Sequence, residues 1–289
     1  MDAKLWLLGG VMAKRKKTYH KTDPKGRKKP ARDSERPNSP APSSGLPLLY
    51  GKHAVLSALA NPRRRIRRLL LTLESRDGLQ GEIEQALTKG DHSNIEILSF
   101  DKRDLEDRLP AGAVHQGIAL EAEAPQTLHI EDIINQTEED AGATIVIVDQ
   151  ATDPHNIGAI LRSAAAFGAA AVVIQDRNSP DITGTMAKAA SGALERVALV
   201  RTTNLVRAMD KLKAAEYWCI GLDGTATQTL AQTNLSGRVA LVLGAEGAGL
   251  RRLTRENCDL LAKVPMTDAV ESLNLSNACA IALYEKARS

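Results

Sequence analysis

Aromatic residues are scarce in this chain of 289 residues, because Phe, Tyr and Trp together make up only 3% of the sequence. Proteins that bind single-stranded nucleic acid usually stack the bases on aromatic side chains. Such stacking platforms are largely excluded here, so any contact with RNA must rely on charged and polar groups. The hydrophobic content of 43% is that of a globular protein with a core, and the length allows two domains of ordinary size.

Cysteines and long apolar runs are also few. The three cysteines, Cys219, Cys258 and Cys279, are widely spaced, and none belongs to a CxxC pair. This pattern argues against a disulfide framework and against a zinc site, so we expect no metal and a location in the reducing cytoplasm. No apolar run approaches the roughly 18 residues of a membrane span, so no membrane anchor is predicted.

Positive charge is concentrated near the N-terminus. Residues 1–46 carry twelve Lys or Arg against four Asp or Glu, a net charge of +8, which leaves −5 for residues 47–289. The segment is rich in Pro and Ser and lacks apolar periodicity, so we expect a disordered basic tail. The tail either attracts phosphate backbones or only keeps the protein in solution. Its opening, MDAKLWLLGGVM, lacks a signal-peptide cleavage site, and Met1 and Met12 are alternative starts.

Residues 47–124 have the alternating pattern of a small α/β domain. Helical spacing occurs in HAVLSALA, LQGEIEQALTK and KRDLEDRL, whereas RRLLLTL, IEILSF and GIALEAEA have the composition of strands. Between the first helix and the first strand, NPRRRIRR holds five arginines in six positions. We predict phosphate contacts for Arg63, Arg64 and Arg65, and the alternative is a solvated start of the strand. A polar linker, residues 125–141, follows.

Residues 142–289 repeat strand and helix in a second domain. The predicted strands are continuous apolar runs: TIVIVD, AAVVIQ, VALVR, WCIGLD, VALVLG and LLAKVP. Strands of this kind are buried on both faces, which predicts a parallel sheet covered by helices. Ligands of open parallel sheets bind beyond the carboxyl ends of the strands. A functional site is therefore expected in the loops that follow these strands.

Three of these loops carry polar residues that local structure does not require. After TIVIVD, Asn156 lies near a helix start, and Arg162 stands among apolar residues, where it needs an acidic partner or a bound anion. After VALVLG, glycines surround Glu246 in GAEGAGL, a spacing that differs from the GxGxxG fingerprint of dinucleotide sites. After LLAKVP, the stretch SLNLSN contains Ser272 and Asn274, and it offers more polar groups than one helix cap can use.

These segments resemble the three motifs of the SPOUT superfamily of RNA methyltransferases, in its SpoU or TrmH branch. The matching stretches are NIGAILR at 156–162, LGAEG at 243–247, and VPM followed by SLNLS at 272–276. YGKHAVLSAL and AVHQGIAL are similar to the ribosomal-protein-like substrate-binding domain that precedes the catalytic domain in ribosomal RNA methylases. The resemblance implies an α/β fold in which the C-terminal parallel-sheet domain is tied in a trefoil knot, an exception to the rule against knots. It also implies a homodimer formed through the knotted domain.

The resemblance further implies a reaction and a set of residues. The reaction is methyl transfer from S-adenosyl-L-methionine to a ribose 2′-hydroxyl of RNA, most simply a guanosine of 23S ribosomal RNA. The implied cofactor-binding residues are Gly244, Val264, Met266 and Leu273. The implied catalytic residues are Asn156, Arg162, Glu246, Ser272 and Asn274. The planar charge of Arg162 suits a phosphate contact, and a role as the base stays open, although a guanidinium accepts protons poorly.

Three other functions stay open on the sequence. A transfer-RNA ribose methylase shares the motifs, but relatives of that kind generally lack the front domain. A catalytically silent RNA-binding or ribosome-assembly factor keeps the fold without needing the five catalytic residues together. A nucleotide-binding oxidoreductase needs GxGxxG after the first strand of the second domain, where DPHNIG stands instead.

Overall fold

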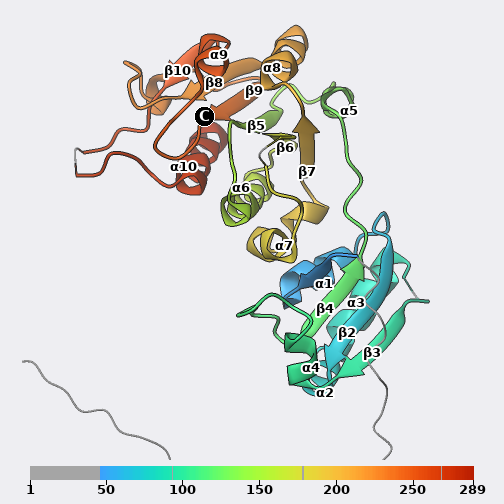
Figure 1. Ribbon diagram of the computed structural model, residues 1–289. Coiled ribbons are helices and arrows are strands. Elements are labelled where there is room, and N and C mark those ends of the chain that lie inside the picture. Colours follow the sequence, from blue (N-terminus) through green and yellow to red (C-terminus); the bar gives the residue numbers. More distant parts are fainter. Residues whose placement is uncertain (1–45, 93, 178, 268) are drawn as a thin grey trace, which may run out of the picture. The chain divides into compact units, whose positions relative to one another are not determined.

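The computed structural model describes residues 46–289, except residues 93, 178 and 268 (Figure 1). The basic tail predicted for residues 1–46 therefore lies outside the described residues, apart from residue 46. Within the described ranges, no helix combines the length and the apolar character that crossing a lipid bilayer would require.

The first part of the described chain contains a four-stranded sheet with the order β1-β4-β2-β3. Its strands are β1 (Leu48–Tyr50), β2 (Ile66–Thr72), β3 (Glu96–Phe100) and β4 (Ile118–Ala122). Its helices are α1 (Lys52–Leu59), α2 (Leu73–Gly78), α3 (Gln80–Gly90) and α4 (Lys102–Glu106). Strand β2 pairs parallel to β3 and antiparallel to β4. The predicted strands and helices of this region are confirmed, whereas β1 and α2 were not predicted because such short elements show no periodic pattern.

The second part contains a six-stranded sheet with the order β10-β8-β9-β5-β6-β7, and all its pairings are parallel, as predicted. Its strands are β5 (Thr144–Val148), β6 (Ala171–Gln175), β7 (Ala198–Thr202), β8 (Trp218–Leu222), β9 (Val239–Leu243) and β10 (Leu260–Ala262). Its α-helices are α5 (Ile130–Gln136), α6 (Pro154–Ala166), α7 (Gly184–Ala190), α8 (Leu205–Ala214), α9 (Arg252–Glu256) and α10 (Leu275–Arg288). Two short 3-10 helices are η1 (Ala193–Glu195) and η2 (Leu230–Gln232).

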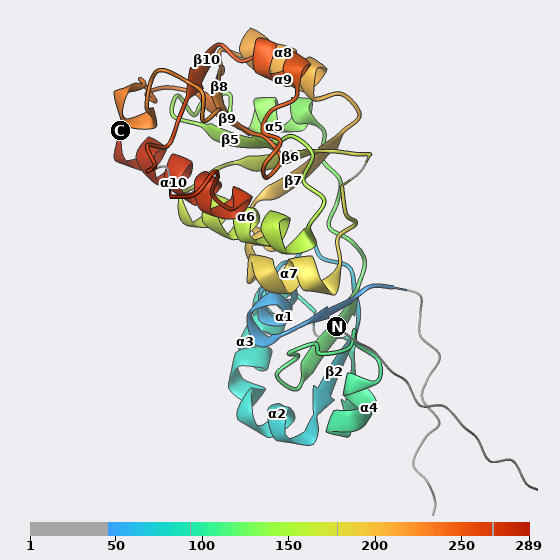
Figure 2. The ribbon, with the colours of Figure 1, turned by 60° about the vertical axis from the view of Figure 1, so that its left-hand side comes forward.

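Strand β5 is apolar at each position after Thr144 because helices cover both faces of the sheet. Val146 and Val148 belong to the buried cluster that includes residues of α6 and α10. Ile145 and Ile147 point to the opposite face and belong to the cluster formed with α5 and α8. Figures 1 and 2 show these helix pairs on opposite sides of the sheet. Full burial of each such side chain contributes about 1.5–3 kcal/mol, so the central strands anchor the loops that follow them.

The linker predicted for residues 125–141 contains a helix, α5, that the sequence analysis did not predict. Ile130 and Ile133 lie three residues apart and are both buried against residues of α8. At the start of the helix, the Asp132 carboxylate accepts a hydrogen bond from the backbone N–H of His129 at 2.8 Å. Its three isoleucines span little more than one helical turn, which is too short for a recognisable helical pattern, and packing against the second sheet makes this segment ordered.

The order of the strands reverses at the pair β5 and β9. Strand β9 lies between β8 and β5, whereas β6 and β7 follow on the other side of β5. Ligands of parallel α/β sheets bind beyond the strand ends at such a reversal. Val148 and Leu243 are paired at the carboxyl ends of these two strands, so the loops beginning at Asp149 and Gly244 start side by side.

Candidate functional site

Two aspartates shape the loop that follows β5. The carboxylate of Asp149 is fully buried and accepts hydrogen bonds from the backbone N–H of Arg251 at 3.2 Å and from its Nε at 2.7 Å. Asp153 caps α6 by accepting a hydrogen bond from the backbone N–H of His155 at 2.9 Å. A cap of this kind stabilises a helix by about 1 kcal/mol. Together these contacts fix the first turn of α6 and with it Asn156.

Asn274 connects the three loops that the sequence analysis singled out. It caps α10, because its Oδ1 accepts hydrogen bonds from the backbone N–H of Ser276 at 3.0 Å and from the Ser276 hydroxyl at 2.6 Å. Its Nδ2 donates to Oδ1 of Asn156 at 3.0 Å and to Oε2 of Glu246 at 3.4 Å. The oxygen of this amide thus serves the helix and its nitrogen serves the site, which accounts for a polar cluster larger than one cap needs.

Arg162 does not contact the other four predicted catalytic residues. Its side chain is exposed on α6 and forms no hydrogen bond or ion pair with any described residue. Six residues separate it from Asn156, which corresponds to about 9 Å along the helix axis and about 120° around it. The acidic partner considered from the sequence is therefore absent among the described residues. The guanidinium is exposed to solvent and can meet an anionic ligand.

A cavity of about 550 Å³ opens beside these loops, within the size range of small-molecule sites. We call it the β9 cavity, and its lining comes from the loops after β8, β9 and β10 and from the start of α10. It is lined by all four residues predicted to bind the cofactor and by two predicted catalytic residues: Gly244, Val264, Met266, Leu273, Glu246 and Ser272. Asn274 lies at the edge of this lining, where it donates hydrogen bonds to Glu246 and to Asn156.

Gly244 leaves no space for a side chain. A Cβ atom built there would lie 2.0 Å from the carbonyl carbon of Gly249 and 2.2 Å from its oxygen. Two backbone hydrogen bonds hold this close approach, from the N–H of Ala245 to the oxygen of Gly249 at 3.0 Å and from the N–H of Gly249 to the oxygen of Ala245 at 2.9 Å. Gly249 has a φ of +68°, a conformation that glycine adopts without strain. The tight turn brings backbone groups to the wall of the β9 cavity.

The loop after β8 also lines the β9 cavity, and the sequence analysis missed it. The carboxylate of Asp223 accepts hydrogen bonds from the Thr225 N–H at 2.8 Å, the Thr225 hydroxyl at 2.6 Å and the Arg255 Nε at 2.6 Å. Burial alone would raise the pKa of Asp223, but these hydrogen bonds outweigh it and hold the pKa below its usual value. The available signal was the strand WCIGLD, whose final Asp lies at the same sheet edge as the three motifs.

The lining of the β9 cavity suits a ligand with both an apolar part and a positive charge. Leu222, Leu243 and Val264 provide apolar walls, and Gly244 keeps one wall free of side-chain bulk. Asp223 is already paired with Arg255, which also lines the cavity, whereas Glu246 forms no ion pair with a described residue, so its carboxylate can favour a bound cation where water is partly excluded. S-adenosylmethionine has this combination, because it joins an adenosine to a sulfonium.

The arginine cluster in the first part of the chain divides into exposed and buried members. The side chain of Arg65 is 82% exposed and lies 3.6 Å from Glu123, and Arg63 is exposed as well. The side chain of Arg64 is only 2% exposed, and its Nε lies 3.7 Å from Oε1 of Glu195. Its buried nitrogen atoms form no hydrogen bond. This corrects the prediction for Arg64, because a phosphate cannot reach a guanidinium that is buried against η1.

The described residues contain no group of three or more His, Cys, Asp or Glu that could hold a metal ion. The three cysteines are free. Burial raises the pKa of Cys219, of Cys258 and of Cys279 to about 12, so these thiols stay protonated at neutral pH. A thiol is a poor nucleophile in that form, and the cysteines have no part in the site.

Two family models match the chain, one over the region of the four-stranded sheet and one over the region of the six-stranded sheet. Residues 48–128 match the model described as RNA 2′-O ribose methyltransferase substrate binding, and residues 143–284 match the SpoU rRNA Methylase family. The chain is 40% identical over 245 residues to the 23S rRNA (guanosine-2′-O-)-methyltransferase RlmB of Vibrio cholerae, covering 83% of this chain and 96% of that protein. It is 38% identical over 244 residues to RlmB of Escherichia coli K12, covering 83% and 98%.

Solved structures share the fold at lower identity. The SpoU methyltransferase AviRb from Streptomyces viridochromogenes, in complex with AdoMet, is similar with a TM-score of 0.70 and 23% identity, over 85% of this chain and 90% of that one. The AdoMet-bound rRNA methyltransferase from Sinorhizobium meliloti has a TM-score of 0.68 and 23% identity, over 84% and 87%. At this identity the similarity shows the arrangement of strands and helices.

Proposed function

Since this chain belongs to the SpoU rRNA methylase family, we propose that it transfers a methyl group from S-adenosyl-L-methionine to the ribose 2′-hydroxyl of a guanosine in 23S ribosomal RNA. The observation that carries the proposal is the chain of hydrogen bonds from Asn156 through Asn274 to Glu246. It joins three loops at the edge of a cavity that suits the cofactor. The similarity to RlmB proteins covers nearly their whole length and supports 23S ribosomal RNA over transfer RNA as the substrate.

We assign the two sheets to different tasks. Residues 142–289 carry the transfer site, residues 47–124 bind the RNA substrate, and residues 125–141 connect the two. The basic tail, residues 1–46, adds attraction to RNA that does not depend on its sequence. The two family matches support this division, because one is described as a methylase and the other as a substrate-binding domain.

The cofactor belongs in the β9 cavity. We assign Gly244, Val264, Met266 and Leu273 to the adenosine and methionine parts, and the carboxylate of Glu246 favours the cationic group. When bound there, S-adenosylmethionine supplies an electrophilic methyl group. The apolar walls exclude water from this group and so protect it from solvent.

The residues at the edge of the cavity hold the acceptor. Methyl transfer needs a correctly aligned ribose oxygen that loses its proton. Ser272 offers a hydroxyl to the ribose, and Asn274 positions the side chains of Asn156 and Glu246 around the acceptor through the hydrogen bonds described above. Arg162 holds the adjoining phosphate through its exposed guanidinium. We assign the role of proton acceptor for the ribose 2′-hydroxyl to the carboxylate of Glu246 rather than to Arg162, because a guanidinium is a poor proton acceptor.

Three further properties follow from the family resemblance. We propose that the second domain is knotted and that two chains associate through it. The exposed apolar side chains of Ile281 and Tyr284 on α10 support an interface on this helix. Since ribosomal RNA is the proposed substrate, we expect the enzyme to act in the cytoplasm.

A transfer assay followed by mapping tests the proposed function. The full-length protein is incubated with radiolabelled S-adenosylmethionine and with 23S ribosomal RNA from cells lacking the gene, and the modified nucleotide is then located. We expect label on the 2′-oxygen of one guanosine. If only transfer RNA is labelled, the substrate is transfer RNA rather than ribosomal RNA. If the protein binds RNA but transfers no methyl group, it is a catalytically silent assembly factor.

The close packing at Gly244 makes a prediction for cofactor binding. We expect Gly244→Ala to lower the affinity for S-adenosylmethionine at least tenfold, because the added methyl group would displace the turn at Gly249. Calorimetric titration of the full-length protein measures this effect. Gly81→Ala is the matched control, because a Cβ there meets no atom within 4 Å. Unchanged affinity in Gly244→Ala would mean that the cofactor binds elsewhere.

The division of the arginine cluster makes a prediction for RNA binding and stability. Replacing both Arg63 and Arg65 by Ala should weaken binding of ribosomal RNA and reduce the salt slope by about 0.7–0.9 per lost phosphate contact, with little change in stability. Arg64→Ala should instead lower the free energy of unfolding by about 1–3 kcal/mol, because the buried Glu195 loses its cation and keeps only its hydrogen bond from Asn61. RNA titrations at several salt concentrations and thermal unfolding measure both. If Arg64→Ala lost RNA affinity at unchanged stability, Arg64 would contact RNA, which would contradict the conclusion that its buried guanidinium cannot reach a phosphate.

A further inference from the structure

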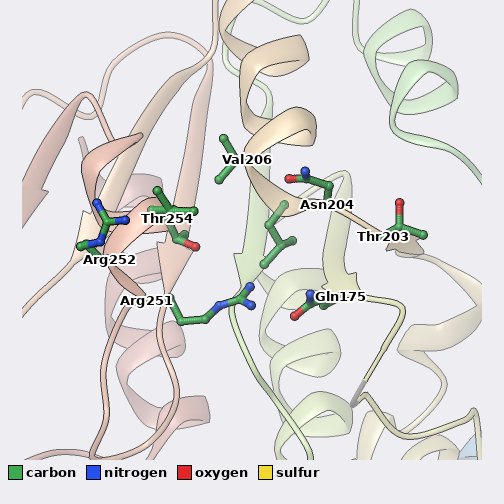
Figure 3. Close-up of a pocket in the computed structure, with 9 residues that line it drawn as sticks. Gln175, Thr203, Asn204, Val206, Arg251, Arg252 and Thr254 are labelled. Atoms are coloured by element: carbon green, nitrogen blue, oxygen red, sulfur yellow. The ribbon is translucent and has the colours of Figure 1, made fainter.

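A second cavity, of about 420 Å³, lies next to the β9 cavity, and we call it the β6 groove (Figure 3). The segment after β9 separates the two, since Leu250 lines the β9 cavity whereas Arg251 and the three residues after it line the β6 groove. The remaining lining consists of Gln175, Thr203, Asn204, Leu205 and Val206. Gln175 is the last residue of β6, and the other four follow β7, so the β6 groove opens at the same sheet edge as the proposed transfer site.

Asp149 holds Arg251 in the β6 groove. Its Oδ1 lies 2.7 Å from Nε and 2.6 Å from Nη2 of Arg251, and its Oδ2 accepts the backbone N–H of the same residue. Contacts to two guanidinium nitrogens fix the plane of the group. The Arg251 side chain is still 39% exposed, and Figure 3 shows its guanidinium extending toward Gln175. The remaining N–H groups can therefore donate to a ligand.

The charge in the β6 groove is largely balanced, which disfavours a phosphate as the ligand. Asp149 carries the charge opposite to Arg251 at hydrogen-bond distance. Arg252 is paired in the same way with Glu256, at 2.9 Å. A phosphate would lose its water without meeting a net positive charge, whereas a neutral base needs only hydrogen bonds and apolar contact.

The polar groups of the β6 groove offer more donors than acceptors. Asn204 uses its Oδ1 to cap α8, where it accepts the backbone N–H of Arg207 at 3.1 Å, which leaves its Nδ2 as a donor. Gln175 is half-buried, and its amide forms no hydrogen bond with any described residue. Together with Arg251, these groups match a ligand edge that carries adjacent acceptors. Guanine has such an edge in its O6 and N7 atoms.

Apolar side chains supply the other surface that a base needs. Leu253 is 58% exposed, and it lines the β6 groove together with Val206 and Leu205. In a chain with so few aromatic residues, aliphatic groups must cover the face of a base. Exposure of a large apolar residue beside unpaired donors is the pattern of a binding surface.

We propose that the β6 groove binds an unpaired guanine base of the RNA substrate, with Arg251 and Gln175 donating hydrogen bonds to its O6 and N7 edge. Asp149 is the positioning residue for Arg251. The inference rests on the proposed function, because it requires RNA at this edge of the sheet. The ribose hydroxyl that accepts the methyl group is the same in all four nucleosides, so it cannot identify the nucleotide. The β6 groove would supply that selectivity by binding a base.

Two variants that leave Asp149 paired test the β6 groove: Gln175→Leu and Leu253→Asp. Each should raise the KM for a 23S ribosomal RNA transcript about tenfold, leave kcat at saturating RNA within about twofold, and leave S-adenosylmethionine affinity and Tm unchanged. The matched control is Gln136→Leu, which replaces an exposed glutamine at the end of α5 and should behave as wild type. Equal KM values for the wild type and both variants would overturn the proposal.

A modified transcript identifies the atom that is read. RNA made with 7-deazaguanosine lacks N7, so it should raise the KM of the wild type by a larger factor than that of Gln175→Leu. The same factor in both proteins would show that Gln175 does not contact this edge and would overturn the assignment. Transfer by the wild type to the unmodified transcript establishes the proposed function separately. If the wild type does not methylate the unmodified transcript, both the proposed function and the proposed base site are wrong.

Discussion

Replacing Asn274 by Asp should abolish methyl transfer, with a loss of at least a thousandfold, while the protein stays folded. The new carboxylate still accepts the backbone N–H of Ser276, so the cap of α10 is retained. It cannot donate to Asn156, and it places a second negative charge 3.4 Å from Glu246. Single-turnover transfer with saturating RNA and cofactor measures the loss, which is typical for removal of a group that orients reactants.

Asn274→Ala separates the two roles of this side chain. It removes both the cap and the hydrogen bonds of the site, so the same loss of transfer should come with about 1 kcal/mol less stability. For a domain of this size that corresponds to a Tm lower by about 2–4 °C. If Asn274→Asp transfers methyl groups at the wild-type rate, the residue only caps a helix, and the connection between the three loops has no catalytic part.

Arg162→Ala should reduce transfer by about a thousandfold and leave the affinity for S-adenosylmethionine within about twofold of wild type. Its guanidinium is exposed and does not line the β9 cavity, so its removal changes neither the cofactor site nor the fold. The proposed loss is that of the contact which holds the RNA phosphate in line. Parallel calorimetry with the cofactor and radiolabelled transfer to RNA measure the two effects.

Arg162→Lys tests whether the planar fork or only the charge is needed. Lysine keeps the charge but cannot form two parallel hydrogen bonds with a phosphate, so we expect an intermediate rate. Equal loss of cofactor affinity and transfer in Arg162→Ala would contradict phosphate binding and would give Arg162 a structural role.

The sequence predicted the second domain well because its strands must be buried on both faces. That requirement makes residues 145–148 and 239–243 apolar at every position, and β5 and β9 lie at the centre of the sheet. The same rule directed attention to the loops after these strands, where Asn156 and Glu246 lie. It did not find α5, because Ile130 and Ile133 become buried only through contact with α8, far along the chain.

The sequence by itself predicted which loops hold the polar residues and at which sheet edge these loops lie, because hydrophobic periodicity and loop position are local properties of the chain. Their assignment to a transfer site came from the resemblance to the SpoU branch and stays a prediction. Only the tertiary structure decided which of these groups meet. It joined Asn274 to Asn156 across 118 positions, placed Asp223 in the β9 cavity, and left Arg162 apart. It also buried Arg64 against Glu195, although the neighbouring arginines have the same charge. Charge is a property of the residue, whereas burial and partners depend on what the rest of the chain packs beside it.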